Sequence, residues 1–145
     1  MRRPRAREPG GPVFVDSSGW LAILSASDRH HVSADAALRR LVADRVRLVT
    51  SSLLLAETHR LVLHRVGIAA ARSALDRIGG SGHVDLIFPT REHHAAALDW
   101  LAKLDDQAIT YADATSFAIM RSLRIVRVLG LDRDFATAGF ELIVR

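Results

Sequence analysis

Four carboxylates in this sequence lie beside apolar segments, where a charged side chain needs a partner. Asp16 and Asp132 each follow a short apolar run, and Glu57 and Asp113 lie on the apolar side of helical patterns. Because neighbouring carboxylates repel one another, a cluster of them calls for bound cations, and an oxygen-only set favours Mg²⁺ or Mn²⁺. Such a site suits hydrolysis of a phosphodiester, because metal ions activate water and stabilise the leaving oxygen.

Glu57 and Asp113 also have ordinary structural explanations. Leu54 and Leu61 flank Glu57 on its helical stripe, so this acid faces burial and could pair with an arginine elsewhere in the chain. Asp113 shares a helical face with Phe117, near the start of its helix, where a negative charge interacts favourably with the helix dipole. The dipole explains an acid at this position but not its place on the apolar side.

The other acids follow expected strands. Asp16 could serve only as the cap of the next helix, and Asp132 and Asp134 could be ordinary turn residues. However, the carboxyl ends of neighbouring parallel strands meet at one edge of a sheet, where open α/β sheets keep their active sites. If the first and fourth strands are neighbours, Asp16 and Asp132 lie side by side there.

Strand and helix patterns alternate along the chain, which predicts an α/β fold with a parallel sheet covered on both faces. We expect strands at 13–15, 46–50, 84–88, 125–129 and 141–144, and helices at 20–24, 31–44, 53–66, 68–78, 90–104 and 110–123. The 145 residues fit one domain over 13–145 with no internal linker.

Residues 1–12 carry four arginines against one glutamate and so hold +3 of the net charge of +4. Their Pro and Gly content predicts a basic, disordered leader, although a basic tail can also steer a protein toward RNA, an acidic partner or a membrane surface. The sequence has no membrane-spanning run and no secretory signal, so we expect a cytoplasmic protein without a membrane partner.

Other kinds of site find little support. The chain has no cysteine, which excludes disulfides and thiolate chemistry, and the histidine pairs 30–31 and 93–94 lack zinc-ligand spacing. The glycines at 79–82 lack the Lys-Ser/Thr of a phosphate-binding loop, and no Gly-x-Ser-x-Gly elbow is present. A phospho-accepting receiver domain would carry a lysine late in the fold, whereas Lys103 precedes the fourth strand.

The pattern resembles the PIN-domain ribonucleases and, within them, the VapC-type toxins of bacterial toxin-antitoxin modules. It consists of an Asp after the first strand, a Glu in a helix, an Asp-Ala pair opening a late helix, and Asp-x-Asp-Phe after the fourth strand. The likeness spans residues 13–145. The matching positions are the acidic quartet Asp16, Glu57, Asp113 and Asp132, the auxiliary acid Asp134, and the hydroxyls Ser18 and Ser116.

The resemblance implies a metal-dependent endoribonuclease. Asp16, Asp113 and Asp132 would hold Mg²⁺ or Mn²⁺, and Glu57 would position or deprotonate the attacking water. Cleavage would occur in a single-stranded segment of a structured cellular RNA, leave a 3′-hydroxyl and a 5′-phosphate, and arrest translation. The resemblance further implies a sheet in the order 3-2-1-4-5, a homodimer, and a small antitoxin protein that occupies the site.

One position departs from the family. Many members have Thr or Ser two residues before the fourth acid, where this chain has Gly130, so a hydrogen bond that helps to hold Asp132 would be missing. Together with the nearly neutral body, this supports the alternative of a PIN-like module that binds RNA or protein without cutting. Arg133 is the nearest candidate for contacting the RNA, although a solvated turn arginine is equally consistent with the sequence.

Overall fold

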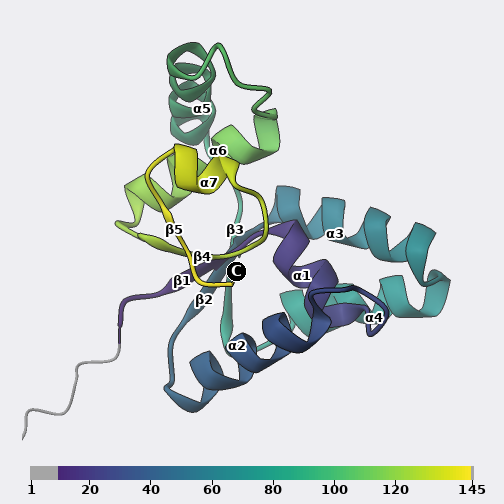
Figure 1. Ribbon diagram of the computed structural model, residues 1–145. Helices are drawn as coiled ribbons and strands as arrows, with labels where there is room; N and C mark the ends of the chain where they lie inside the picture. The colour runs from purple at the N-terminus through teal and green to yellow at the C-terminus, as the bar shows by residue number, and fades with distance from the viewer. Residues whose placement is uncertain (1–9, 145) are drawn as a thin grey trace, which may run out of the picture.

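The computed structural model describes residues 10–144, so most of the leader predicted over 1–12 lies outside the described residues. Residues 10–12 are exposed and belong to no helix or strand. The chain forms a five-stranded, all-parallel sheet in the order β3-β2-β1-β4-β5, which confirms the expected α/β topology (Figure 1). Parallel strands need crossover connections, which are usually helices.

The strands are β1 (Val13–Val15), β2 (Leu48–Ser51), β3 (Val84–Ile87), β4 (Arg127–Leu129) and β5 (Glu141–Leu142). The helices are α1 (Ser17–Leu24), α2 (His31–Ala43), α3 (Ser52–Arg65), α4 (Ile68–Gly79), α5 (Arg91–Lys103), α6 (Tyr111–Ser122) and α7 (Asp134–Thr137). Among the described helices, none has both the length and the apolar character needed to cross a membrane.

Strand β1 lies at the centre of the sheet and is fully buried. Its side chains alternate between two cores: Val13 and Val15 pack in a cluster with α1, α2 and α4, whereas Phe14 packs with residues of α6 and α7. This alternation follows from the two-residue period of a strand. Helices therefore cover both faces of the sheet, as Figure 1 shows.

The order of the strands creates a crevice at the carboxyl end of β1. The chain leaves β1 for β2 on one side and returns later to β4 on the other side. The connections of β1 and β4 therefore diverge at this point, which is where open α/β sheets bind ligands. Asp16 and the loop after β4 both lie at this switch point, in agreement with the expected neighbourhood of the first and fourth strands.

Two strands begin later than the sequence pattern predicted, for the same reason. Arg45 and Arg124 adopt positive φ angles of 56° and 55° at the ends of α2 and α6. The following residues, Val46 and Ile125, donate their N–H groups back to Leu41 and Met120 of the helices. This arrangement is a Schellman cap, which pairs terminal carbonyls of the helix. The apolar residues that we assigned to strand starts therefore close helices.

The end of the chain also differs from the expectation. The single-turn helix α7 was not predicted, and β5 contains two residues instead of four. Phe135 anchors α7 because its ring is fully buried and packs against Phe117 with a centroid distance of 5.0 Å. Helical periodicity is not recognisable in so short a segment, and long-range packing holds it in place.

Helix α1 lies directly on the backbone of β4. A Cβ atom added to Gly19 would lie 2.2 Å from the carbonyl oxygen of Leu129, so only glycine fits here. On the other side of the helix, Trp20 Nε1 donates to Thr50 Oγ1 at 3.2 Å, and Thr50 Oγ1 donates to the carbonyl oxygen of Val15 at 2.9 Å. These contacts secure the turn that carries Asp16.

Candidate active site

An acidic pocket of about 340 Å³ lies at the carboxyl ends of β1 and β4. Its carboxylates come from five separate places in the chain, namely Asp16, Asp28, Glu57, Asp113 and Asp132. All four members of the predicted quartet therefore line one hollow. The sequence spacing alone could not place the two helical acids there, because that depends on how α3 and α6 pack.

Asp16 occupies the cap position of α1 but does not cap it. Its backbone is extended and its side chain makes no capping hydrogen bond. Oδ2 accepts a hydrogen bond of 2.8 Å from Ser18 Oγ, whereas Oδ1 is buried and has no partner among the described residues. The carboxylate is 3% exposed, so its placement is not explained by a role in helix capping.

Burial raises the pKa of Asp16 to about 6, because the charged form loses its hydration. The hydrogen bond from Ser18 opposes this rise, and the charges of Asp113 and Glu57 add to it. The two neighbours connect Asp16 electrostatically to α6 and α3. A buried carboxylate in such surroundings is a functional candidate on physical grounds.

Asp113 sits in the first turn of α6 and is 9% exposed. Its N–H donates to Oγ1 of Thr110, the residue that caps the helix, at 3.1 Å. Burial raises the pKa of its carboxyl group, and the charges of Asp132 and Asp134 raise it further. The cap thus fixes the backbone of Asp113, and the charges that raise the pKa of its carboxyl group come from other acids.

Asp113, Asp132 and Asp134 each offer one carboxylate oxygen, and these atoms lie within 4.8 Å of one another. The N–H of Asp134 donates to Oδ1 of Asp132 at 2.9 Å, which binds the two acids of the Asp-x-Asp pair together. Desolvation and the charge of Asp132 raise the pKa of Asp134. Asp134, predicted as an auxiliary acid, therefore belongs to the closest trio, and Asp16 faces that trio from β1.

Glu57 lies at the rim of the pocket and is less buried than its apolar stripe predicted. The ion pairs within residues 10–144 are Arg39 with Asp35 and Arg47 with Asp85, and none of these four residues lines the pocket. The alternative of a buried Glu57–arginine pair is therefore not realised in this part of the chain. Its carboxylate stays available to the pocket.

The donor set fits a hard divalent cation. Three carboxylate oxygens meet within 4.8 Å, and the unpartnered Oδ1 of Asp16 borders the same pocket. Oxygen-only ligation is what Mg²⁺ and Mn²⁺ favour, and a cation would relieve both the mutual repulsion and the cost of the buried oxygen.

Residues 13–141 match the sequence profile of the PIN domain. The chain belongs to the PIN-domain family. Two curated relatives are the 23S rRNA-specific endonuclease VapC20 of two strains of Mycobacterium tuberculosis, each 36% identical over 133 residues, which is 88% of this chain and 95% of the relative. The crystal structure of M. tuberculosis VapC20, described as a sarcin-ricin loop cleaving toxin, has a TM-score of 0.82 and 34% identity over 92% of this chain and 99% of that one. The chain is thus a VapC-type PIN-domain protein.

Ser18, which we expected as a hydroxyl near the acids, lies beside Gly130 in this PIN domain. Ser18 Oγ donates to Asp16 and accepts the N–H of Leu131 at 3.0 Å, so it joins the β1 turn to the loop after β4. A Cβ atom at position 130 would lie 3.0 Å from the Cβ of Asp16 and 3.5 Å from Ser18 Oγ. Gly130 therefore affects the surroundings of Asp16 more directly than the pose of Asp132.

Ser116 does not reach the acids of this PIN domain through its hydroxyl. It is 1% exposed, and its Oγ donates to the carbonyl oxygen of Ala112 at 2.9 Å. Such a bond to the preceding helical turn is common for serine in a helix. Ser116 is also absent from the lining of the pocket among the described residues.

Two charged lining residues were not identified from the sequence. Asp28 comes from the loop before α2, where no periodic pattern indicates a direction. Arg65 follows Glu57 by eight residues on α3, a spacing of slightly more than two turns that places both on one side of the helix. That spacing was a usable signal for Arg65, whereas Asp28 could be found only from the folded chain.

Proposed function

We propose that this PIN-domain protein is a metal-dependent endoribonuclease that acts as the toxin of a toxin-antitoxin pair. The observation that carries the proposal is the acidic pocket, in which four predicted acids from distant segments gather around a buried, unpartnered carboxylate oxygen. Mutually repelling acids destabilise a fold that has no cation to bind. The names of the relatives, a 23S rRNA-specific endonuclease and a loop-cleaving toxin, support the same activity.

The residue roles follow from the position of each acid. Asp113, Asp132 and Asp134 together with Asp16 would hold Mg²⁺ or Mn²⁺, which supplies the positive charge that the phosphodiester and the departing oxygen require. Glu57 lines the same pocket from α3 and would orient the attacking water or accept its proton. Ser18 holds Asp16 in its rotamer.

The substrate is a structured ribosomal RNA. The relatives are named for cleavage of 23S rRNA and of its sarcin-ricin loop, and the alignment covers nearly their whole length. Water would attack the phosphorus and the bond to the 3′ oxygen would break, which leaves a 3′-hydroxyl and a 5′-phosphate. Damage to this RNA arrests translation, which fits the role of a toxin that acts in the cytoplasm.

The partners follow from the family. A small antitoxin would occupy the acidic pocket and so prevent RNA from reaching Asp16 and its neighbours. Two copies of the chain would form a homodimer. Because these partners bind only the folded chain, each would raise its apparent stability.

The test is cleavage of total RNA by the purified, antitoxin-free protein with Mg²⁺, Mn²⁺ or EDTA. Asp113→Asn should reduce the rate by at least about a hundredfold, because it removes a charge from the cation site. Asp105→Asn is the matched control, since Asp105 is exposed in the loop between α5 and α6, outside the pocket. Equal inertness of wild type and Asp113→Asn in both metals would favour a non-catalytic binding module instead.

A further inference from the structure

A second hollow lies beside the acidic pocket, and positively charged side chains line it. It has a volume of about 770 Å³, and its polar lining residues include Arg29, His30, Arg133 and Glu141. Leu131 lines both hollows and forms the wall that they share. A volume of this size accommodates a ligand as large as a nucleotide. We call this hollow the basic trough.

Two loops separate the hollows, and each does so with an adjacent Asp-Arg pair. In the loop before α2, Asp28 lines the acidic pocket and the next residue, Arg29, lines the basic trough. In the loop after β4, Asp132 lines the acidic pocket and Arg133 lines the trough. Each Asp-Arg pair thus contributes its aspartate to the acidic pocket and its arginine to the trough. The charge changes sign across Leu131.

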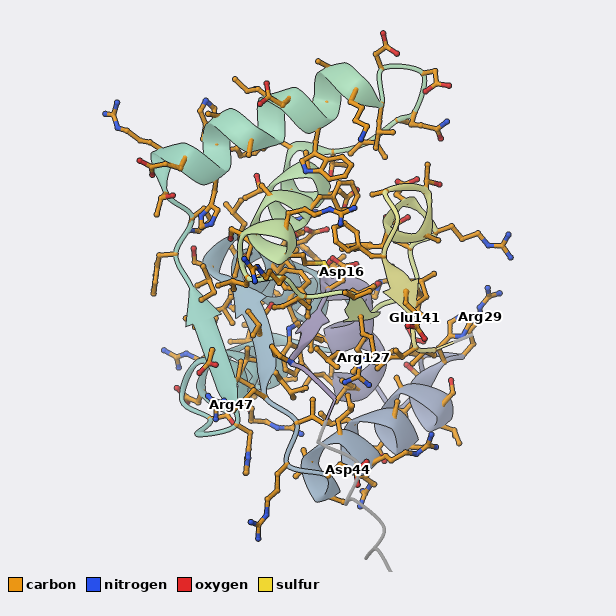
Figure 2. All side chains as sticks on the ribbon, turned by 90° about the vertical axis from the view of Figure 1, so that its left-hand side faces the viewer. Asp16, Arg29, Asp44, Arg47, Arg127 and Glu141 are labelled. Atoms are coloured by element: carbon orange, nitrogen blue, oxygen red, sulfur yellow. The ribbon has the colours of Figure 1, made fainter. Side chains whose placement is uncertain are left out.

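The guanidinium groups of the basic trough are open to a ligand. Arg29 and Arg133 are exposed, and neither forms an ion pair within the described part of the chain. Arg29 Nε donates to His30 Nε2 at 3.0 Å, which keeps these two side chains together. Glu141 also lines the trough and lies next to Arg29 at the edge of the molecule (Figure 2). Two arginines against this one glutamate leave the described lining positive.

An RNA strand needs such a surface beside the acidic pocket. A cation can neutralise the acids around the scissile phosphate, but the neighbouring phosphates would be repelled by any acid without a cation. The strand must therefore leave the pocket toward positive charge. Arginine suits this role because its planar guanidinium binds two phosphate oxygens at once.

We propose that the basic trough binds the RNA phosphates next to the scissile one, through Arg29 and Arg133. This inference rests on the proposed function, because that function places the scissile phosphate in the acidic pocket. The apolar side chains of Leu142 and Ala136 in the trough contact the sugars between the bound phosphates. The negative charge of Glu141 weakens the binding of phosphates. It limits binding to RNA strands that run from the acidic pocket past Arg29 and Arg133.

The experiment measures binding and cleavage separately. The probe is a fluorescein-labelled RNA hairpin with the sarcin-ricin loop sequence, and its Kd is measured by anisotropy at several salt concentrations with all variants in an Asp113→Asn background. Arg29→Ala and Arg133→Ala should each weaken binding about three- to tenfold. Each should also reduce the slope of log Kd against log salt by about 0.7, the value for one phosphate contact on a single strand.

Two further variants make the result specific. Arg72→Ala removes the same charge from an exposed position of α4 outside both hollows and should leave the Kd and its salt slope unchanged. Glu141→Gln removes the opposing charge and should tighten binding about twofold. In the otherwise wild-type enzyme, Arg29→Ala and Arg133→Ala should raise KM and leave kcat within about twofold, since neither touches the reacting phosphate.

The outcomes separate the two proposals. If wild type cleaves RNA but Arg29→Ala and Arg133→Ala bind the hairpin as Arg72→Ala does, the trough proposal is overturned and the nuclease stands. That result would assign the trough to a protein partner. If wild type binds the hairpin through the arginines but never cleaves RNA, the nuclease proposal is wrong, and the trough is an RNA-binding surface with no scissile phosphate beside it.

Discussion

Asp16 occupies the N-cap position of α1, but its side chain does not cap the helix. It stands where a helix cap belongs, yet its Oδ2 accepts from Ser18 and its Oδ1 has no partner among the described residues. Burying a carboxylate in this way costs free energy, because no neighbouring cation repays the lost hydration. Burial of the charged carboxylate destabilises the metal-free protein. A proton or a cation bound to Asp16 removes this destabilisation.

This cost predicts a pH dependence of stability. The pKa of Asp16 is raised from 3.8 to about 6, so the folded chain binds this proton more tightly than the unfolded chain does. The stabilisation is fully present below about pH 4 and is lost as the pH rises through 6. Between pH 4.5 and 7.5 in EDTA, the stability of Asp16→Asn relative to wild type should increase by about 2 kcal/mol.

Urea denaturation of both proteins at the two pH values measures this difference. The exposed Asp105 gives the control, since Asp105→Asn should show the same offset from wild type at both pH values. An offset for Asp16→Asn that does not change with pH would mean that the carboxylate is paired in the folded chain.

At the scale of elements, the site depends on how closely α1 approaches β4. The Cβ of an alanine at position 19 would lie 2.2 Å from the carbonyl oxygen of Leu129, and a backbone atom cannot move aside as a flexible side chain can. The helix would have to shift away from the strand, and Asp16 and Ser18 would move with it. The close contact therefore links the stability of the fold to the geometry of the acids.

Gly19→Ala should accordingly destabilise the protein by about 1–3 kcal/mol, as overpacking does. The matched control is Gly82→Ala, because a Cβ there meets nothing within 4 Å. This second variant should be neutral or slightly more stable, since alanine restricts the unfolded chain. Urea midpoints of the two variants test the prediction, and equal midpoints would contradict the close contact.

Particular elements show what the sequence could predict and what it could not. A short apolar run identified the central strand β1, helical spacing of apolar residues identified helices α1 to α6, and the acids at strand ends and on apolar stripes indicated the site. The resemblance gave Asp134 only an auxiliary role, and its place beside Asp113 and Asp132 depends on α7, which Phe135 holds by long-range packing. Likewise, Val46 and Ile125 look like strand residues but close helices, because the preceding arginines adopt positive φ angles.

For the whole molecule, we expect metal binding and folding to be coupled. Acids from β1, α3, α6 and the loop after β4 meet only in the folded chain, so a cation that binds them stabilises that state alone. The acidic pocket and the basic trough carry opposite charge because they bind different ligands. The pocket binds a cation, and the trough binds RNA phosphates.

Mn²⁺ should therefore raise the Tm of the EDTA-treated protein in a concentration-dependent way. At about a hundred times the Kd the stabilisation reaches ~3 kcal/mol, which corresponds to roughly 6–10 °C for a domain of this size. Asp113→Asn and Asp132→Asn should lose most of the shift, whereas Asp105→Asn should retain it. Differential scanning calorimetry makes the comparison, and an equal shift in all four proteins would assign the metal to another place.

The chemical nature of the cut RNA ends tests the proposed hydrolysis by water most directly. A synthetic RNA hairpin with the sarcin-ricin loop sequence is cleaved in Mn²⁺, and the products are weighed by mass spectrometry. We expect one fragment with a 3′-hydroxyl and one with a 5′-phosphate, because water attacks the phosphorus and the 3′ oxygen leaves with a proton, and no such products from Asp113→Asn. Fragments ending in a 2′,3′-cyclic phosphate would show attack by the ribose hydroxyl and contradict hydrolysis by water.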